Sequence, residues 1–149
     1  MAGAYEFEPV GPAGLSRDDR EQIKQLGEER WTRALEAGDF DTVCGLCTDD
    51  VVYMPADHPA LRGRDQFRRW LEAFPRIVRM TQPMTWIDGQ GDMAMAEATF
   101  TVTLEVEGRT VESAGKAMCG LRRQAGEWRV KSVCWNFDQP MGPPPPAAA

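Results

Sequence analysis

One stretch of the chain decides the fold: residues 31–70, WTRALEAGDFDTVCGLCTDDVVYMPADHPALRGRDQFRRW. It predicts the end of a long helix, a short second helix, one strand, a loop and the start of a third helix. The β-branched pair Val51 and Val52 indicates the strand. Pro55 ends it, and Gly63 marks the turn into the next helix. We expect a helical wall, a strand and a loop in this order to form one side and the rim of a pocket.

The predicted long helix begins upstream of this stretch. Ser16 and Asp19 have the spacing of a capping box, in which each side chain bonds the other's backbone N–H. Apolar residues then recur at helical spacing until Gly38 closes the helix. These apolar positions are Ile23, Leu26, Trp31, Ala34 and Leu35. Two shorter helices are expected at 40–47 and 64–74.

Beyond residue 75 the apolar period changes from 3.6 to 2, which predicts an antiparallel meander. Strands are expected at 80–87, 93–106, 111–123 and 128–136. Pro83 indicates an edge or a bulge in the first of them.

The strand at 93–106 alternates most clearly, so its two faces are predicted separately. The inward face is expected to carry Ala98, Phe100, Val102 and Leu104, and the outward face Thr99, Thr101 and Thr103. Helices followed by a meander predict an α+β fold, with the helices packed on one face of a curved sheet around an apolar interior. We expect an arm at 1–15, a folded domain at 16–139, and a Pro/Ala-rich disordered tail at 140–149.

Composition excludes several classes of protein. The 149 residues, 42% of them hydrophobic, suit one soluble domain. A net charge of −6 disfavours nucleic-acid binding, which requires a basic face. No apolar run approaches the ~20 residues of a membrane span, and the N-terminus lacks an apolar signal segment. We therefore expect a cytoplasmic protein with no membrane partner and no cofactor.

The CGLC motif at 44–47 has the spacing of redox and zinc motifs. A zinc site would need a second ligand pair, and the single histidine, His58, lies outside any such spacing. The motif falls late in a helical pattern, where Cys47 is expected to be buried. We predict core thiols in a reducing compartment, with no zinc and no Cys44–Cys47 disulfide.

Residues 37–67, AGDFDTVCGLCTDDVVYMPADHPALRGRDQF, and 120–140, GLRRQAGEWRVKSVCWNFDQP, carry a resemblance to a known family. They are similar to the first half and the last hairpin of SnoaL-like proteins, within the nuclear transport factor 2-like, ketosteroid isomerase-like superfamily. The resemblance covers about residues 18–139. It implies a conical α+β barrel, usually dimeric, with three N-terminal helices and a pocket between the long helix and the concave sheet. Members include isomerases, dehydratases, cyclases, epoxide hydrolases and binding domains, so the fold alone does not decide function.

The catalytic residues of ketosteroid isomerases do not carry over to this chain. Their aspartate base directly precedes a proline after the first strand, where this chain has Met54. Their tyrosine oxyanion donor corresponds to Trp31, whose indole N–H donates a hydrogen bond but transfers no proton. Their protonated acid falls near Ala117 or Met118. The sequence therefore does not support the isomerase mechanism.

Other polar residues remain as catalytic candidates. His58 lies beside Asp57 in the loop expected to border the pocket, and Asp138 lies near its mouth. A histidine titrates near neutrality and acts as a base when a carboxylate orients it. If the chain is an enzyme, we expect His58 to do the acid–base work, with Asp57 or Asp138 assisting. The alternative is that His58 is a solvated loop residue.

The residues expected to bind a ligand are Trp31, Tyr53, Met54, Trp70, Phe74, Phe100, Val102 and Asn136. The alternative is that the aromatic residues are plain core and that the Asn136 amide satisfies backbone groups.

Three functions stay open. The chain is an isomerase, dehydratase or cyclase acting on an apolar or polyketide-like substrate, a non-catalytic binder of a small apolar or aromatic ligand, or a dimerisation module. An enzyme predicts a titratable group in the pocket, a binder predicts a pocket of apolar and amide groups, and a module predicts a filled interior with a large exposed apolar patch.

Overall fold

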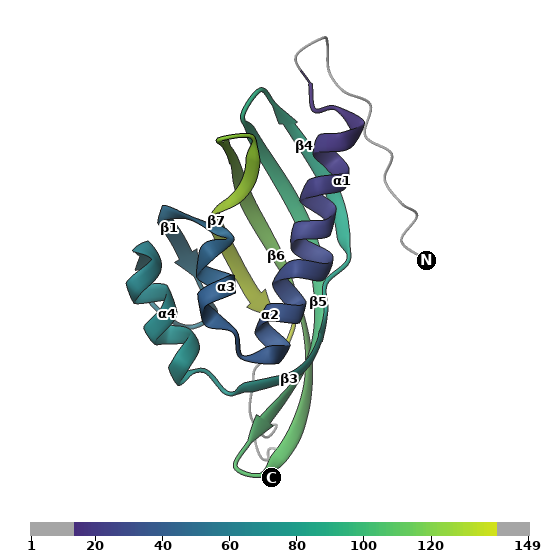
Figure 1. The fold of residues 1–149 in the computed structure, drawn as a ribbon. Coiled ribbons are helices and arrows are strands. Elements are labelled where there is room, and N and C mark those ends of the chain that lie inside the picture. Colours follow the sequence, from purple (N-terminus) through teal and green to yellow (C-terminus); the bar gives the residue numbers. More distant parts are fainter. Residues whose placement is uncertain (1–13, 140–149) are drawn as a thin grey trace.

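The computed structural model describes residues 14–139, in which helices cover one face of a curved sheet (Figure 1). The helical elements are α1 (Arg17–Gln25), the π-helical segment η1 (Leu26–Arg30), α2 (Trp31–Ala37), α3 (Phe40–Gly45) and α4 (Gly63–Ala73). The strands are β1 (Cys47–Met54), β2 (Leu61–Arg62), β3 (Arg76–Thr81), β4 (Met84–Gln90), β5 (Met93–Val106), β6 (Arg109–Gln124) and β7 (Glu127–Phe137). No helix within the described residues is long and apolar enough to cross a membrane.

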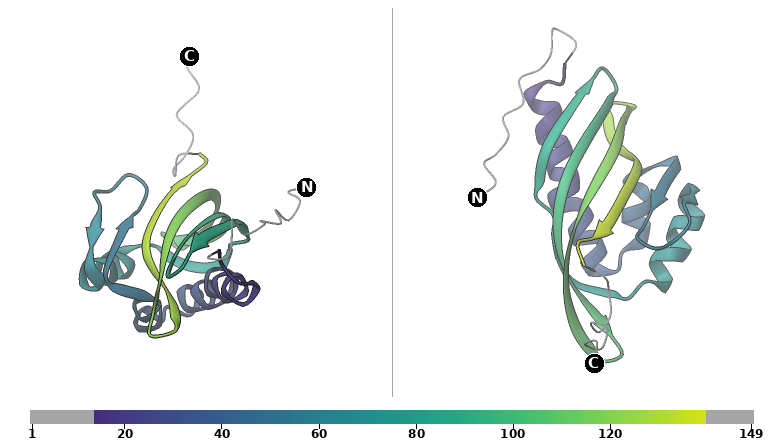
Figure 2. Two further views of the ribbon diagram at one scale, coloured as in Figure 1. Left: turned by 90° about the horizontal axis from the view of Figure 1, so that it is seen from above. Right: turned by 180° about the vertical axis from the view of Figure 1, so that it is seen from behind.

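The seven-stranded sheet has the order β2-β1-β7-β6-β5-β3, and β4 also pairs with β5. β1 and β7 are parallel, and the other pairs are antiparallel. The predicted α+β class, with helices on a curved and mainly antiparallel sheet, is confirmed. The sheet is strongly curved but does not close, so it forms an open cone rather than the expected barrel (Figure 2).

The predicted long helix forms as three consecutive segments, α1, η1 and α2, that run along the concave face of the sheet (Figure 1). The capping box is present at its start: the Asp19 N–H donates to Ser16 Oγ (3.0 Å), and the Ser16 N–H donates to Asp19 Oδ2 (3.1 Å). Asp19 also accepts a hydrogen bond from the Trp128 indole (3.0 Å), which ties this end of the helix to β7. Gly38 ends α2 in a left-handed conformation (φ 66°).

The strand expected at 80–87 is two strands, because the chain breaks at Gln82 and Pro83. Proline has no N–H to donate to a ladder, so a regular strand cannot run through it. β3 and β4 instead pair with successive parts of β5, with Met80 opposite Val102 and Met84 opposite Ala98. The edge of the sheet bends at this break, which places Gln82 beside the interior.

Most other boundaries also differ from the sequence prediction by one or more residues, and two of these differences concern the core. The short helix ends at Gly45 instead of residue 47, because Cys47 already pairs with Val130 and opens β1. The core also begins one residue early, since Leu15 is buried and Gly14 pairs with Gln90. The rest of the predicted arm, and the predicted tail from residue 140, lie outside the described residues.

The predicted faces of β5 are confirmed. Phe100, Val102 and Leu104 are buried, as is Ala98, whereas Thr99 and Thr101 are exposed on the opposite face. The concave face of the sheet is therefore the apolar one, and it faces the helices.

Candidate functional site

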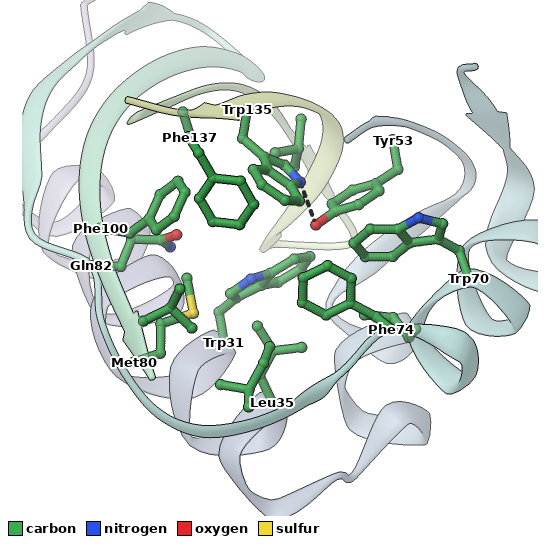
Figure 3. Close-up of a pocket in the computed structure, with 15 residues that line it drawn as sticks. Trp31, Leu35, Tyr53, Trp70, Phe74, Met80, Gln82, Phe100, Trp135 and Phe137 are labelled. Carbon is green, nitrogen blue, oxygen red and sulfur yellow. Dashed lines mark hydrogen bonds between the residues drawn. The ribbon is translucent and has the colours of Figure 1, made fainter. Parts of the chain in front are cut away.

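A pocket lies between the concave face of the sheet, α2 and α4 (Figure 3). Its lining residues are mostly aromatic and come from helices and strands that are distant in sequence. They are Trp31, Leu35, Tyr53, Trp70, Leu71, Phe74, Ile77, Met80, Gln82, Phe100, Val102, Ala117, Val133, Trp135 and Phe137.

The aromatic rings form a continuous wall. Trp70 stacks on Phe74 with centroids 4.6 Å apart, and both rings belong to the C-terminal end of α4. Trp135 contacts Phe100 (5.7 Å) and Phe137 (5.0 Å) in edge-to-face geometry. These are the offset and edge arrangements that aromatic quadrupoles favour. The wall is therefore packed by specific contacts that also hold its shape.

Gly115 on β6 makes room for the Phe100 ring. A Cβ at this position would lie 2.4 Å from the Phe100 ring and 2.2 Å from the Asn136 carbonyl. Real Cβ atoms do not approach so closely, so only glycine leaves room here for the ring and the neighbouring strand.

The free space in the pocket is small. Its volume is about 50 Å³, well below the ~150 Å³ of an apolar cavity that accommodates benzene. Even a ligand of one ring therefore requires side chains of the wall to move, and larger ligands require larger movements.

One hydrogen bond joins polar atoms within the wall: the Trp135 indole N–H donates to the Tyr53 hydroxyl oxygen (2.8 Å). Tyr53 is 7% exposed, and its burial raises the pKa of the phenol because the charged form would be desolvated. The hydroxyl therefore stays protonated. Because its oxygen already accepts from Trp135, its hydrogen is free to donate toward a bound molecule.

None of the lining residues carries a charge at neutral pH. Tyr53 is the one lining residue that titrates, and the lining contains no carboxylate or imidazole to remove a proton. Within the described residues, no cluster of three or more His, Cys, Asp or Glu side chains could hold a metal ion. The site can thus bind and polarise a neutral group.

Six of the eight residues expected to contact a ligand line the pocket together. They are Trp31, Tyr53, Trp70, Phe74, Phe100 and Val102. The other two lie outside its lining. Strand alternation places Met54 opposite Tyr53 and Asn136 opposite Trp135, so both project from the convex face of the sheet. Both are exposed, and the Asn136 amide donates to the Phe137 carbonyl (3.2 Å).

The structure does not bring the expected catalytic residues to the pocket. His58 is exposed, and its Nδ1 lies 2.8 Å from the Pro59 carbonyl oxygen. Asp57 is also exposed and has a positive φ (55°). Asp138 forms an ion pair with Lys116 (2.9 Å) in which both side chains are more than half exposed. A catalytic role for His58, Asp57 and Asp138 stays a prediction, because none of these side chains lines the pocket.

Nine of the fifteen lining residues were not anticipated as ligand contacts, among them Met80, Gln82, Trp135 and Phe137. The period of the last strand could have found two of them, because Trp135 and Phe137 alternate with exposed Cys134 and Asn136. Gln82 could not be found this way, since it belongs to no strand.

The cysteines of the CGLC motif are free thiols in the core. Cys44 is 8% exposed and Cys47 is fully buried. Burial raises the pKa of Cys47 to about 12, so its reactive thiolate is disfavoured. The Cys47 thiol donates to the Val43 carbonyl (3.4 Å), which is a structural contact.

The family model of the SnoaL-like domain matches residues 29–130. Since this is more than half of the 149 residues, the chain belongs to the SnoaL-like family. The resemblance noted in the sequence is thereby confirmed. Among curated proteins, no match to the chain was found.

Solved structures share the fold over nearly the whole chain. A ketosteroid isomerase-like protein from Erwinia carotovora atroseptica is 22% identical, with a TM-score of 0.66 over 79% of this chain and 91% of its own. A proposed dehydratase of the NTF2-like family from Streptomyces avermitilis is 21% identical, with a TM-score of 0.70 over 84% and 100%. A proposed aromatic ring hydroxylase from Novosphingobium aromaticivorans is 20% identical, with a TM-score of 0.72 over 85% and 93%. At these identities the similarity establishes the fold alone.

Proposed function

We propose that this protein binds a small, flat, uncharged molecule in the aromatic pocket and that the Tyr53 hydroxyl donates a hydrogen bond to it. The observation that carries the proposal is the Trp135–Tyr53 hydrogen bond inside a wall of aromatic rings. Donation by the indole polarises the phenol and strengthens it as a donor. Such a donor pairs with an oxygen that accepts a hydrogen bond, as in a carbonyl or ether group.

The charge balance of the pocket supports binding over proton-transfer chemistry. An anionic ligand would lose its hydration without meeting a cation, which costs several kcal/mol. An isomerase, dehydratase or cyclase working by proton abstraction would need a general base within hydrogen-bond reach of the substrate. The lining supplies neither a cation nor a base, so a neutral ligand held without turnover fits it best.

The size of the pocket narrows the class of ligand further. One aromatic ring with small substituents already requires the wall to open slightly, whereas a polyketide-like substrate of several fused rings would have to displace much of the wall. We therefore favour monocyclic aromatic ligands that carry an oxygen acceptor.

Acetophenone and ethylbenzene are suitable probes, because they have similar size and differ in the acceptor oxygen. We expect the wild type to bind acetophenone more tightly than ethylbenzene, by about three- to tenfold, measured by titration calorimetry. Tyr53→Phe should remove this preference and leave ethylbenzene binding nearly unchanged.

Two further variants serve as controls of location. Trp70→Ala, which deletes part of the wall, should abolish binding of both probes. His58→Ala should leave both affinities unchanged, because His58 does not line the pocket. Wild-type protein that binds neither probe, or equal loss of binding in His58→Ala, would refute the proposal.

Catalysis by Tyr53 is a second candidate, which the polarised hydroxyl favours. Tyr53 would act as an electrophile that stabilises charge developing on a substrate oxygen, without itself abstracting a proton. The names of the two proposed enzymes among the structural neighbours are compatible with such a part, although they establish nothing for this chain. Turnover that is lost in Tyr53→Phe, with substrate binding retained, would favour this candidate.

We further propose that the protein is a homodimer that functions in the cytoplasm. The convex face of the sheet carries exposed methionines, of which Met93 (61% exposed) and Met95 (50% exposed) lie on β5. The free thiols Cys44 and Cys47 suit a reducing compartment.

A further inference from the structure

Gln82 is held in the break between β3 and β4 by the helix that it faces. Its Nε2 donates to the Gly27 carbonyl (2.9 Å), and one residue past Pro83 the Met84 N–H donates to Glu28 Oε1 (2.8 Å). Gly27 and Glu28 both belong to the π-helical segment η1. Such wide turns are uncommon and occur frequently at functional sites. The break and η1 thus fix each other's position.

This anchoring decides which end of the Gln82 amide is available. The bond to the Gly27 carbonyl requires the nitrogen, so the orientation of the amide is set by its partner. The Gln82 oxygen has no hydrogen-bond partner within residues 14–139, and neither has the Trp31 indole N–H. Both residues line the apolar pocket, so this acceptor and this donor are available to a molecule bound there.

Gln82 and Trp31 also stand between two internal spaces. Both residues line the aromatic pocket and a second, smaller space whose other lining residues include Gly27, Met84 and Cys119. In Figure 3 the Gln82 amide lies at the opposite side of the pocket from Tyr53. A molecule whose oxygen is bonded by Tyr53 would therefore extend toward Gln82.

We propose that Gln82 is a second ligand-binding residue, whose oxygen accepts a hydrogen bond from a hydroxyl group at the far end of the ligand. The proposal rests on the function proposed above and makes its ligand class narrower: a hydroxylated aromatic carbonyl compound, with its acceptor at Tyr53 and its donor at Gln82. The Trp31 indole N–H donates to the same hydroxyl oxygen, which lets the pair distinguish a hydroxyl from an ether. The second space accommodates a short substituent beyond it.

The test compares acetophenone, para-hydroxyacetophenone and para-methoxyacetophenone, at a pH that keeps the phenol protonated. In the wild type, the hydroxyl compound should bind about three- to tenfold more tightly than acetophenone, as expected for one hydrogen bond in a desolvated site. The methoxy compound has no hydrogen to donate, so it should bind no more tightly than acetophenone. This comparison needs no variant and stands even if substitutions at Gln82 impair folding.

Gln82→Met keeps the size of the side chain and removes both amide atoms, including the Nε2 that bonds the Gly27 carbonyl. It should abolish the advantage of the hydroxyl compound over acetophenone, and the comparison of the two ketones within this variant separates that effect from the loss of the Gly27 bond. Gln124→Met, at the exposed end of β6, is the matched control and should leave the advantage intact. Tyr53→Phe should weaken both ketones and preserve the difference between them.

Each contrary result has a distinct meaning. Equal binding of the three ketones by the wild type, an advantage that survives in Gln82→Met, or equal weakening of all three in that variant would overturn the part assigned to Gln82. Those results leave the proposed function standing if Tyr53→Phe still weakens acetophenone. Wild-type protein that binds no ketone overturns both proposals.

Discussion

At Tyr53, a single neighbour determines what the residue can do. A buried phenol without a partner would carry a desolvation cost, and the Trp135 N–H relieves it by bonding the oxygen. Because the Tyr53 oxygen is the acceptor in this bond, the hydroxyl hydrogen remains available to a ligand. Replacing Trp135 with phenylalanine would keep the aromatic wall and return the acceptor side of Tyr53 to the pocket, so the two residues act as one unit.

Burial has a different consequence at Cys47. Its ordinary pKa of 9.0 rises to about 12, because the thiolate would be desolvated in the core. Above pH 9 the unfolded chain loses this proton while the folded chain keeps it. Stability contributed by the protonated thiol is thus fully present below pH 9 and falls as pH rises toward 12.

Between pH 9 and pH 12 we therefore expect the Cys47 thiol alone to lower the free energy of unfolding by up to ~1.4 kcal/mol per pH unit. Urea unfolding on both sides of pH 9 measures the slope, and Cys47→Ala should make it shallower whatever its own cost in stability. Cys134→Ala is the control, because Cys134 is exposed and contributes no buried thiol. An unchanged slope in Cys47→Ala would contradict the prediction.

At the scale of elements, the sequence predicted best the strand whose apolar and polar residues alternate. β5 was predicted with both ends correct, because fourteen residues alternate without interruption. The break after β3 was missed, since Pro83 marks an irregularity without saying whether the strand bulges or divides. Cys47 continues a helical pattern yet starts a strand, because pairing with β7 is a long-range contact that local spacing does not contain.

The residues of the candidate site also divide into those that local periods predict and those that they do not. The aromatic residues of α2, α4 and β5 followed from helical and strand periods. His58 was selected because it is the one histidine and lies beside an acid. Neither fact says which way its side chain points. Gln82 was missed because its position depends on the carbonyl of Gly27, fifty-five residues earlier in the chain.

The fit between η1 and β4 can be tested at Gly27. A Cβ there would lie 1.7 Å from Met84 Cε, so Met84 must move if alanine is introduced. Helix propensity favours alanine by about 1 kcal/mol, and Met84 Cε is the end of a flexible side chain that can turn away at a smaller cost than a rigid core would impose. We expect Gly27→Ala to gain less stability than propensity alone would give, and Met84→Ala in the same chain to remove the part of this deficit that comes from the contact.

Gly45 provides the matched control for this substitution. It ends α3, and a Cβ there would meet nothing within 4 Å. Gly45→Ala should stabilise the protein by about 0.5–1 kcal/mol in urea unfolding, since only the propensity and the unfolded state change. If Gly27→Ala stabilises as much as Gly45→Ala, the contact with Met84 does not constrain η1.

At the scale of the molecule, the sheet separates two surfaces. Its concave face holds the aromatic pocket, and its convex face carries a row of exposed apolar side chains across three strands, which ends at Glu97 on β5. Cys134 on β7 stands in register between Met54 on β1 and Met118 on β6. Met93 and Met95 lie on the same side of β5, four and two residues before Glu97, and we call the five exposed side chains of Met54, Met93, Met95, Met118 and Cys134 the methionine face. Polar Thr99 and Thr101 continue the same side of β5 beyond it.

Dimerisation through the methionine face is the last prediction. Met118 lies between Cys134 on β7 and Glu97 on β5 and is 40% exposed, so a second acidic side chain there should oppose burial against a second copy of the chain. We expect the wild type to sediment as a dimer and Met118→Glu as a monomer at the same concentration. Because the pocket lies on the other face, the affinity of Met118→Glu for acetophenone should stay within about twofold of that of the wild type.

Val78→Glu introduces the same charge at a residue with nearly the same exposure, 41%, on β3, which lies at the opposite edge of the sheet from β1. This control should remain dimeric. A monomeric wild type, or a dimer that withstands Met118→Glu, would show that the methionine face is not the contact between copies.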